Sequence, residues 1–356
     1  MGYNIAMNIS DGRIITLQRR IAPELADTIV LRYYILRGVA QSQPVGRRAL
    51  AVALGRTERE IRREERQLRK VGLISSSAHG IRLTFDGEDI LRDLSQYVAQ
   101  LSGSASLEAF LMDRFRLTRA IVVPGDSDLD VSAKKDMALS GARLLGEVVR
   151  DDDVVAVTGG TTMAEMAAAI PAAGPGAARN ITVVPARGGL GEDVEKQADT
   201  VAASLAKQLG GSYRLLNLPD DLSHELLAGI VAEPRIRQLL HTITQARVVA
   251  HGVGTAEEMA RRRNFSEAEI ERMLGLGAVG EAFGYYFNPA GEVVYTTSSL
   301  GLRLADLATV ETVITISGGS SKAEALAAVL RNGFSHIVVT DEGAARRVQQ
   351  ITSNLH

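Results

Sequence analysis

The sequence predicts an α/β protein in two parts, a small helical module followed by a larger domain built on a parallel sheet. Three observations carry this prediction. A chain of 356 residues is long enough for two or more domains. Residues 1–85 carry 15 Lys and Arg against 7 Asp and Glu, whereas residues 86–356 carry 25 against 35. From residue 105 on, short apolar runs alternate with helical patterns, which is typical of a mainly parallel sheet with helices on both faces.

The composition excludes several classes of protein. Apolar residues make up 46% of the chain and charged residues 23%, as in globular proteins with a sizeable core. The absence of cysteine excludes disulfides, thiol catalysis, iron–sulfur clusters and cysteine-based zinc sites. The chain has no run of about 18 apolar residues, and its first 20 residues lack the apolar core of a signal peptide. We therefore expect a cytoplasmic protein that does not act at a membrane.

The basic first part begins with an arm and two helices. Residues 1–22 show no clear period, so we expect an N-terminal arm there. Apolar residues at helical spacing predict a helix over 23–41. A second, short helix is predicted over 47–54, with Gly55 as its C-terminal cap.

Thr57 and Glu60 have the spacing of a capping box, which predicts the start of a third helix. Gly72 closes it, and two short strands are expected at 73–74 and 81–83 around a tip. Helix, short helix, turn, basic helix and hairpin follow one another in the order of a winged helix-turn-helix, which reads DNA.

The third helix is basic on the face opposite to its apolar side chains. A helix fits the major groove, and outward Arg residues pair with phosphates or guanine edges. We therefore predict DNA contacts from this helix and from the start of the second helix, at Arg47, Arg48, Thr57, Arg59, Arg62, Arg63, Arg66 and Lys70. The alternative is a salt-bridged surface helix, since Glu58/Arg62 and Glu65/Arg69 are i, i+4 pairs.

A further helix is predicted over 86–101, and Gly103 and Ser104 are expected to form a small linker. Such a helix also offers a surface on which two subunits can pair, as DNA readers of this kind often do. The predicted domains are thus a winged helix-turn-helix with its linker helix at 23–103 and a second domain at 104–356.

The second domain is predicted to hold seven strands with helices between most of them: Ala120–Val123, Val154–Val157, Ile181–Val184, Tyr213–Leu216, Val248–Ala250, Thr312–Ile316 and His336–Val339. Ligands of such sheets bind in the loops at the carboxyl ends of the strands. Glycine gathers in those loops, so we expect a binding site there.

Two of the glycine loops are near-copies, TGGTT at 158–162 and SGGSSK at 317–322. Glycine allows a close backbone approach, and helix N-termini with Ser or Thr hydroxyls bind anions. Together with Arg187 and the cluster at 261–263, these loops suggest a phosphorylated ligand that carries one or two phosphates. Neither loop fits GxxxxGK[ST], and GxGxxG is absent, which disfavours a nucleoside triphosphate or a dinucleotide.

Signs of catalysis are few. The histidines show no metal-binding spacing, and no GxSxG elbow occurs, so we predict no catalytic residue, no metal and no cofactor. His251 follows a predicted strand and either lines the site or bonds to the backbone. Glu281 either accepts hydrogen bonds from sugar hydroxyls or is a surface carboxylate.

Nine longer stretches form a specific combination: QPVGRRALA at 43–51, VVPGDSD at 122–128, VVAVTGGTTMAEMA at 154–167, VPARGGLGEDVEKQADT at 184–200, YRLL at 213–216, MARRRN at 259–264, EAFGYYFNPAGEVV at 281–294, GGSSKAEA at 318–325 and VTDEGAA at 339–345. With them the chain resembles the SorC class of bacterial transcription factors, and within it the regulators of central glycolytic genes. The resemblance runs from about residue 23 to the end.

The resemblance implies a winged helix-turn-helix joined to a Rossmann-like sugar-phosphate-binding domain, similar to glucosamine-6-phosphate deaminases and ribose-5-phosphate isomerases. It implies a repressor of genes for the triose half of glycolysis, induced by fructose-1,6-bisphosphate, with dimers that pair into tetramers on operator DNA. The ligand-binding positions expected from its motifs and the glycine loops are Gly159, Gly160, Thr161, Thr162, Arg187, Gly188, Gly189, Gln197, Arg262, Glu281, Gly318, Gly319, Ser320, Ser321 and Lys322.

Three other functions stay open. The first is a regulator of the same class that senses a different sugar phosphate. The second is a phosphosugar isomerase or deaminase with an added DNA-binding module, although the acid–base residues of those enzymes are not recognisable here. The third is a sensor that acts through protein partners, which leaves the basic helix unexplained.

Overall fold

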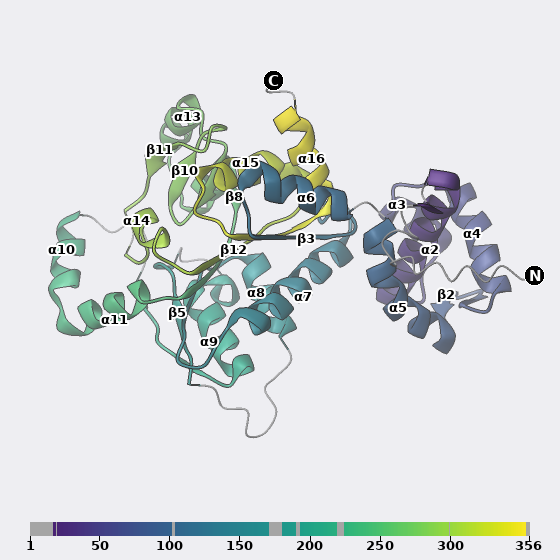
Figure 1. Ribbon diagram of the computed structural model, residues 1–356, viewed down its shortest axis with the longest axis horizontal. Helices are drawn as coiled ribbons and strands as arrows, with labels where there is room; N and C mark the ends of the chain where they lie inside the picture. The colour runs from purple at the N-terminus through teal and green to yellow at the C-terminus, as the bar shows by residue number, and fades with distance from the viewer. Residues whose placement is uncertain are drawn as a thin grey trace, which may run out of the picture. The chain divides into compact units, whose positions relative to one another are not determined.

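The computed structural model describes residues 17–18, 20–101, 104–170, 180–189, 193–218, 224–298 and 300–353. The chain divides into two compact units, the first ending at Ser106 and the second beginning at Leu107 (Figure 1). In the described part of the chain, every helix is too short or too polar to cross a membrane. Most of the predicted arm lies outside the described residues, but Leu17, Gln18, Arg20 and Ile21 near its end are helical.

The first unit is a winged helix-turn-helix, as predicted. Its elements are α2 (Pro23–Ser42), α3 (Arg47–Ala53), α4 (Glu58–Lys70), β1 (Ile74–Ser77), β2 (Gly80–Leu83) and α5 (Phe85–Leu101). One apolar cluster holds them together, with Leu36 of α2, Leu50 of α3, Ile61 of α4 and Ile81 of β2 at its centre. β1 and β2 pair antiparallel as the wing.

The start of α4 follows the sequence rule that predicted it. The Thr57 hydroxyl accepts a hydrogen bond from the Glu60 backbone amide at 3.3 Å, and the Glu60 carboxylate accepts one from the Thr57 amide at 2.9 Å. These reciprocal bonds satisfy amides that the first helical turn leaves open. The capping box therefore fixes where the basic helix begins.

The second unit is built on a seven-stranded sheet in which all strands are parallel, in the order β3-β13-β12-β7-β4-β5-β6. The strands are β3 (Arg119–Val123), β4 (Val154–Val157), β5 (Thr182–Pro185), β6 (Ser212–Tyr213), β7 (Val248–Gly252), β12 (Thr312–Ile316) and β13 (Ile337–Asp341). Their carboxyl ends meet at one edge, because Val157 pairs with Pro185 and Ile316 pairs with Gly252.

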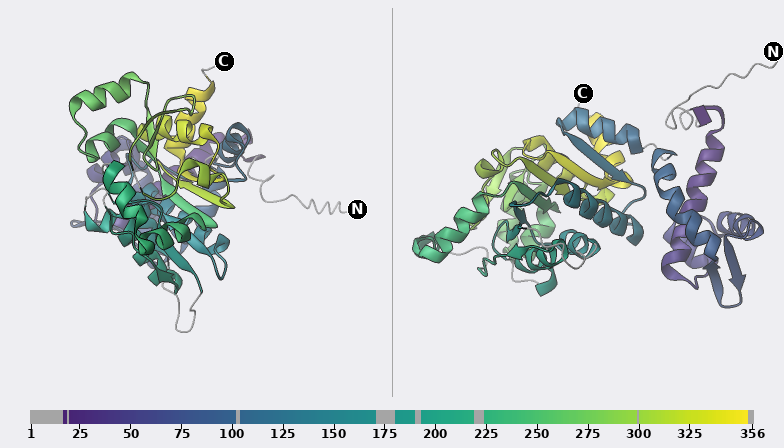
Figure 2. Two further views of the ribbon diagram at one scale, coloured as in Figure 1. Left: turned by 90° about the vertical axis from the view of Figure 1, so that its left-hand side faces the viewer. Right: turned by 60° about the horizontal axis from the view of Figure 1, so that its bottom comes forward.

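Helices cover both faces of this sheet, as predicted (Figures 1 and 2). Successive strand residues point to opposite faces, so Val155 and Val157 belong to one core and Ala156 to the other. One core is closed by α7 (Val131–Val148), α8 (Thr161–Ala169) and α9 (Ala198–Leu209). The other is closed by α6 (Ser104–Phe115), α11 (Pro234–Thr244), α15 (Ala323–Asn332) and α16 (Glu342–Ser353).

A second sheet was not predicted. Four short antiparallel strands follow the order β11-β10-β9-β8 and lie next to two helices. Their bounds are β8 (Gly254–Thr255), β9 (Gly280–Ala282), β10 (Tyr285–Phe287) and β11 (Val293–Thr296), and the helices are α12 (Ala256–Arg262) and α13 (Glu267–Gly275). Strands of two to four residues leave almost no alternating pattern in the sequence, which explains the omission.

Six of the seven strands predicted for the large sheet agree with the structure to within two residues at either end. The predicted strand at 213–216 is wrong beyond Tyr213, because the backbone amides of Leu216 and Asn217 bond to the Asp199 carboxylate and not to a neighbouring strand. The predicted linker at Ser104 is also wrong, since Ser104 begins α6; Gly103 lies outside the described residues. The remaining connections are α10 (His224–Ala232), which packs against α11, the 3-10 turns η1 (Val194–Lys196) and η2 (Ser320–Lys322), and α14 (Leu304–Leu307).

Candidate functional site

The basic face of α4 is exposed, as the sequence predicts. Ile61, Glu64, Glu65 and Leu68 face inward and are buried. The residues that remain exposed on the helix include Arg59, Arg62, Arg63, Arg66 and Lys70. The helix therefore presents a row of cations to its surroundings, which suits the phosphates of a DNA groove.

Two buried glutamates of α4 tie the helix to its neighbours, which sequence reasoning missed. Glu64 accepts hydrogen bonds from Arg32 of α2 at 2.8 Å and from Arg63 at 2.7 Å. Glu65 accepts from Arg47 of α3 and from the Ser76 hydroxyl of the wing, the latter at 2.6 Å. Burial alone would raise the pKa of Glu65, but the hydrogen bonds from Arg47 and Ser76 outweigh it and hold the pKa below its usual range.

These contacts change the interpretation of two predicted DNA contacts. Arg47 bonds to a carboxylate of its own unit, whereas its neighbour Arg48 is exposed. The Thr57 hydroxyl bonds to Glu60 within the helix cap. Of the two ion pairs that the alternative expected, Glu58–Arg62 forms at 3.3 Å, whereas Glu65 turns inward.

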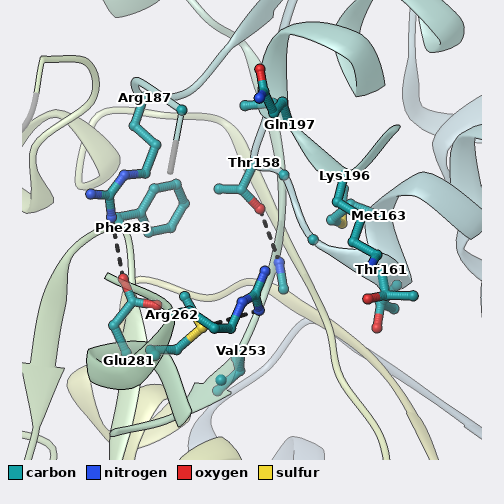
Figure 3. A pocket seen from close by; sticks show the side chains of 18 of the residues that line it. Thr158, Thr161, Met163, Arg187, Lys196, Gln197, Val253, Arg262, Glu281 and Phe283 are labelled. Atoms are coloured by element: carbon teal, nitrogen blue, oxygen red, sulfur yellow. Dashed lines mark hydrogen bonds and ion pairs between the residues drawn. The ribbon is translucent and has the colours of Figure 1, made fainter. Parts of the chain in front are cut away.

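A pocket lies at the carboxyl edge of the large sheet (Figure 3). It is bounded by the loops after β4, β5 and β7, by α12, and by the β9–β10 turn. Its lining includes most of the expected ligand-binding positions: Gly159, Gly160, Thr161, Thr162, Arg187, Gly188, Gly189, Gln197, Arg262, Glu281 and Lys322. Arg263, from the cluster at 261–263, also lines it, as do Lys196, Glu258 and Met259, which the sequence did not indicate.

The TGGTT loop has the geometry of an anion cradle. Gly159 passes so close to the next loop that a Cβ there would lie 2.4 Å from the Lys196 carbonyl oxygen, and Gly160 has a φ of +109°. Both positions therefore require glycine. α8 starts at Thr161 without a side-chain cap, which leaves amides of its first turn open, and Thr161, Thr162 and Met163 of that turn line the pocket.

The opposite wall holds two guanidinium groups on one buried carboxylate. Glu281 accepts hydrogen bonds from Arg187 at 3.2 Å, from Arg263 at 3.1 Å and from the Gly284 amide at 2.5 Å. The three charged side chains are at most 8% exposed. Glu281 is thus no surface carboxylate, and its contact with Arg187 is drawn in Figure 3.

The charge of the pocket suits an anion. Its described lining includes the cations Arg187, Lys196, Arg262, Arg263 and Lys322 but only two carboxylates, Glu258 and Glu281. Arg262, which is labelled in Figure 3, comes from α12. Its guanidinium lies 3.4 Å from the Met259 sulfur. In the described residues, no group of three or more His, Asp or Glu side chains is placed to hold a metal ion.

The SGGSSK loop differs from its near-copy. Lys322 lines the pocket, whereas Gly318, Gly319, Ser320 and Ser321 are not among the lining residues. The amides of Gly319 and Ser321 instead bond to Asp341 and Asp128, each at 2.7 Å. Of the two near-copies, TGGTT therefore lines the pocket as a loop, whereas SGGSSK contributes only Lys322.

His251 is a core residue and is not part of the pocket lining. It is fully buried, with Nδ1 2.9 Å from the Gly252 carbonyl oxygen and Nε2 2.8 Å from the Thr315 hydroxyl. Nδ1 therefore carries the proton and Nε2 accepts from Thr315. Burial lowers the pKa of His251 to about 4, because the hydrogen bond to Gly252 offsets only part of the desolvation.

Comparison with known proteins identifies the family. Residues 29–98 match the CggR N-terminal DNA binding domain, and residues 99–349 match a sugar-binding domain family. The central glycolytic genes regulator of Priestia megaterium is 42% identical over 337 residues, which cover 94% of this chain and 98% of that one. This chain belongs to the central glycolytic genes regulator family, within the SorC class.

Other relatives agree with this assignment. The central glycolytic genes regulator of Bacillus subtilis is 38% identical over 94% of this chain and 98% of its own. A crystal structure described as a SorC family regulator from Enterococcus faecalis has a TM-score of 0.64 at 36% identity, covering 68% of this chain and 99% of that one. The full-length sorbitol operon regulator SorC of Klebsiella pneumoniae, at 18% identity, shares the fold over 96% of this chain and 99% of its own, with a TM-score of 0.63.

The two neighbouring arginines of α3 give a first test. Arg47→Ala leaves Glu65 buried without its cation, so we expect the first unit to lose about 1–3 kcal/mol of unfolding free energy. Arg48→Ala removes an exposed charge and should change the unfolding free energy by less than about 0.5 kcal/mol. Differential scanning calorimetry measures both. Equal stability of the two variants would contradict the structural role of Arg47.

The buried histidine gives a test by pH. An unfolded histidine titrates near 6.5 and folded His251 at about 4, so the unfolded state binds the extra proton between these values. The free energy of unfolding should therefore fall by about 2 kcal/mol between pH 7 and pH 5 through this group. Urea unfolding followed by circular dichroism should show this loss reduced in His251→Gln. His241→Gln, an exposed control, should keep it. An unchanged pH dependence in His251→Gln would refute the assignment.

Proposed function

We propose that this protein is a transcriptional repressor of glycolytic genes whose affinity for operator DNA is lowered by fructose-1,6-bisphosphate. The observation that carries this proposal is the pocket with anion-binding groups on two walls. The first turn of α8, which has no side-chain cap, lies on one wall, and the guanidinium groups of Arg187 and Arg263 lie on the other. The family's DNA-binding and sugar-binding domains supply the two activities that such a repressor needs.

A bisphosphate fits this pocket better than a monophosphate. It carries about four negative charges at neutral pH, which complements five cations and two carboxylates in the described lining. One phosphate binds at the start of α8 with Lys322, and the other binds near Arg187 and Arg262. The names of the relatives from P. megaterium and B. subtilis support glycolytic genes as the regulated targets.

The effector acts through linkage between its pocket and the DNA-binding face. The factor by which the effector lowers operator affinity equals the ratio of its affinities for the free and the DNA-bound protein. The exposed cations of α4, together with Arg48, contact the operator in a homodimer or homotetramer in the cytoplasm. A protein bound to DNA in this way loses affinity steeply as salt rises.

A phosphosugar isomerase or deaminase is the main alternative. Such an enzyme needs a carboxylate or histidine that is free to move a proton. Glu281 is held by two guanidinium groups and an amide, and His251 is buried outside the pocket lining. Turnover of fructose-6-phosphate or ribose-5-phosphate by the purified protein would favour the enzyme.

Two neighbouring arginines of α12 test the proposed ligand site. Arg262 lines the pocket, whereas exposed Arg261 pairs with Glu257 and Glu267 outside it. Arg262→Ala should weaken the binding of fructose-1,6-bisphosphate about tenfold or more, because a charge-assisted hydrogen bond is lost. Arg261→Ala removes the same charge and should leave affinity within about twofold. Isothermal titration calorimetry decides, and equal losses in the two variants would contradict the site.

A ligand series tests the proposed effector. At 100 times its Kd, a ligand stabilises the folded state by about 2.7 kcal/mol, which raises the melting temperature by a few degrees. Fructose-1,6-bisphosphate should produce this rise, and fructose-6-phosphate, dihydroxyacetone phosphate and inorganic phosphate should produce less. A larger rise with a monophosphate would reject the bisphosphate.

A further inference from the structure

The SGGSSK loop already holds carboxylates of its own chain. Asp128, in the loop between β3 and α7, accepts hydrogen bonds from the Ser321 amide at 2.7 Å and the Ser321 hydroxyl at 3.0 Å. Its neighbour Asp126 accepts from the Ser320 amide at 3.2 Å. The contacts that a phosphate would make with these amides are thus made by Asp128 and Asp126.

The glycines of this loop are explained by those carboxylates. A Cβ on Gly319 would lie 2.4 Å from an Asp128 carboxylate oxygen, and one on Gly318 would lie 2.4 Å from an Asp341 carboxylate oxygen. Gly319 also has a φ of +94°, which side chains rarely permit. The same residue types that suggest a phosphate loop in the sequence therefore serve a close internal contact.

The anchor beneath this contact is Asp341, at the end of β13. It is fully buried and accepts hydrogen bonds from the amides of Ser127 at 2.9 Å, Gly319 at 2.7 Å and Ala344 at 2.8 Å. Because β13 lies between β3 and β12, one carboxylate joins the loops that follow β3 and β12 to the first turn of α16, which follows β13. The loop that carries Asp128 is therefore held against the SGGSSK loop.

The turn that carries Lys322 is short and leads directly into α15. Ser320–Lys322 forms a single 3-10 turn, closed by a hydrogen bond from the Lys322 amide to the Gly319 carbonyl oxygen at 3.1 Å. Ser320 and Ser321 are exposed, and their amides bond to Asp126 and Asp128. Without Asp128, the Ser321 amide and hydroxyl would bond to water, and the turn would sample more conformations.

We propose that Asp128 is a positioning residue of the effector pocket. Its carboxylate takes the place of an anion on the Ser320–Lys322 turn and holds that turn so that Lys322 lines the pocket. Asp128 itself is not among the lining residues, so it acts on the ligand only through Lys322. This inference rests on the proposed function, because Lys322 is taken to bind a phosphate of the effector.

A double-mutant cycle tests this role. The binding of fructose-1,6-bisphosphate to the full chain is measured by isothermal titration calorimetry for wild type, Asp128→Ala, Lys322→Ala and the double variant. We expect Asp128→Ala to weaken binding about tenfold when Lys322 is present and less than about twofold when it is absent. If Asp128 had only a general structural role, its replacement would weaken binding by the same factor with and without Lys322.

Matched variants accompany the cycle. Asp151→Ala removes an exposed carboxylate of another loop and should leave affinity within about twofold. Asp128→Asn keeps one oxygen as an acceptor for Ser321, so it should lose less affinity than Asp128→Ala. It also keeps the test decisive if the alanine variant does not fold.

Four outcomes would overturn the inference. Unchanged affinity in both Asp128 variants would show that the turn needs no support. Equal losses with and without Lys322 would show that Asp128 acts by another route. Tighter binding in Asp128→Ala would show that the carboxylate competes with the ligand for the turn. Absence of binding to the wild-type protein would reject the proposed effector, and this inference with it.

Discussion

The pocket depends on one buried carboxylate, that of Glu281, which lies between the guanidinium groups of Arg187 and Arg263. Burying an isolated charge is costly, but three hydrogen bonds to Glu281 compensate for the lost water. The two cations exceed the carboxylate by one charge, so the cluster still attracts an anion. Because Arg187 follows a strand of the large sheet and Glu281 belongs to the small one, the same contact joins the two sheets at the pocket.

Buried or bonded carboxylates organise the other functional parts in the same way. Glu65 bonds to Arg47 and Ser76, and so joins the basic helix to the preceding helix and to the wing. Asp341 joins two loops and the first turn of α16 at the sheet edge, beside the turn that carries Lys322. In each case a carboxylate fixes backbone or cations that face a proposed ligand. Rigid support of this kind is what a binding site needs if its geometry is to select one ligand.

Local signals in the sequence predicted much of the fold and part of the site. Apolar runs predicted most strands of the large sheet. The Thr57–Glu60 spacing predicted the start of α4, and TGGTT predicted the loop that precedes α8 and lines the pocket. Contacts between distant residues left no such signal. Asp128 lies 193 positions from Ser321, so the two glycine loops look alike in sequence although only one lines the pocket as a loop. Arg187, which bonds to Glu281, lies 94 positions before it, so this contact also left no local signal in the sequence.

The central claim is that occupancy of the pocket changes the affinity for DNA. The most direct measurement is fluorescence anisotropy of the full chain on a DNA fragment selected from a random-sequence pool, with and without fructose-1,6-bisphosphate. The account predicts that the bisphosphate weakens DNA binding by about 5- to 150-fold, the usual range of allosteric coupling, and that Arg262→Ala needs at least about tenfold more bisphosphate for the same effect. An equal affinity for DNA with and without the bisphosphate, at concentrations that saturate the pocket, would contradict it.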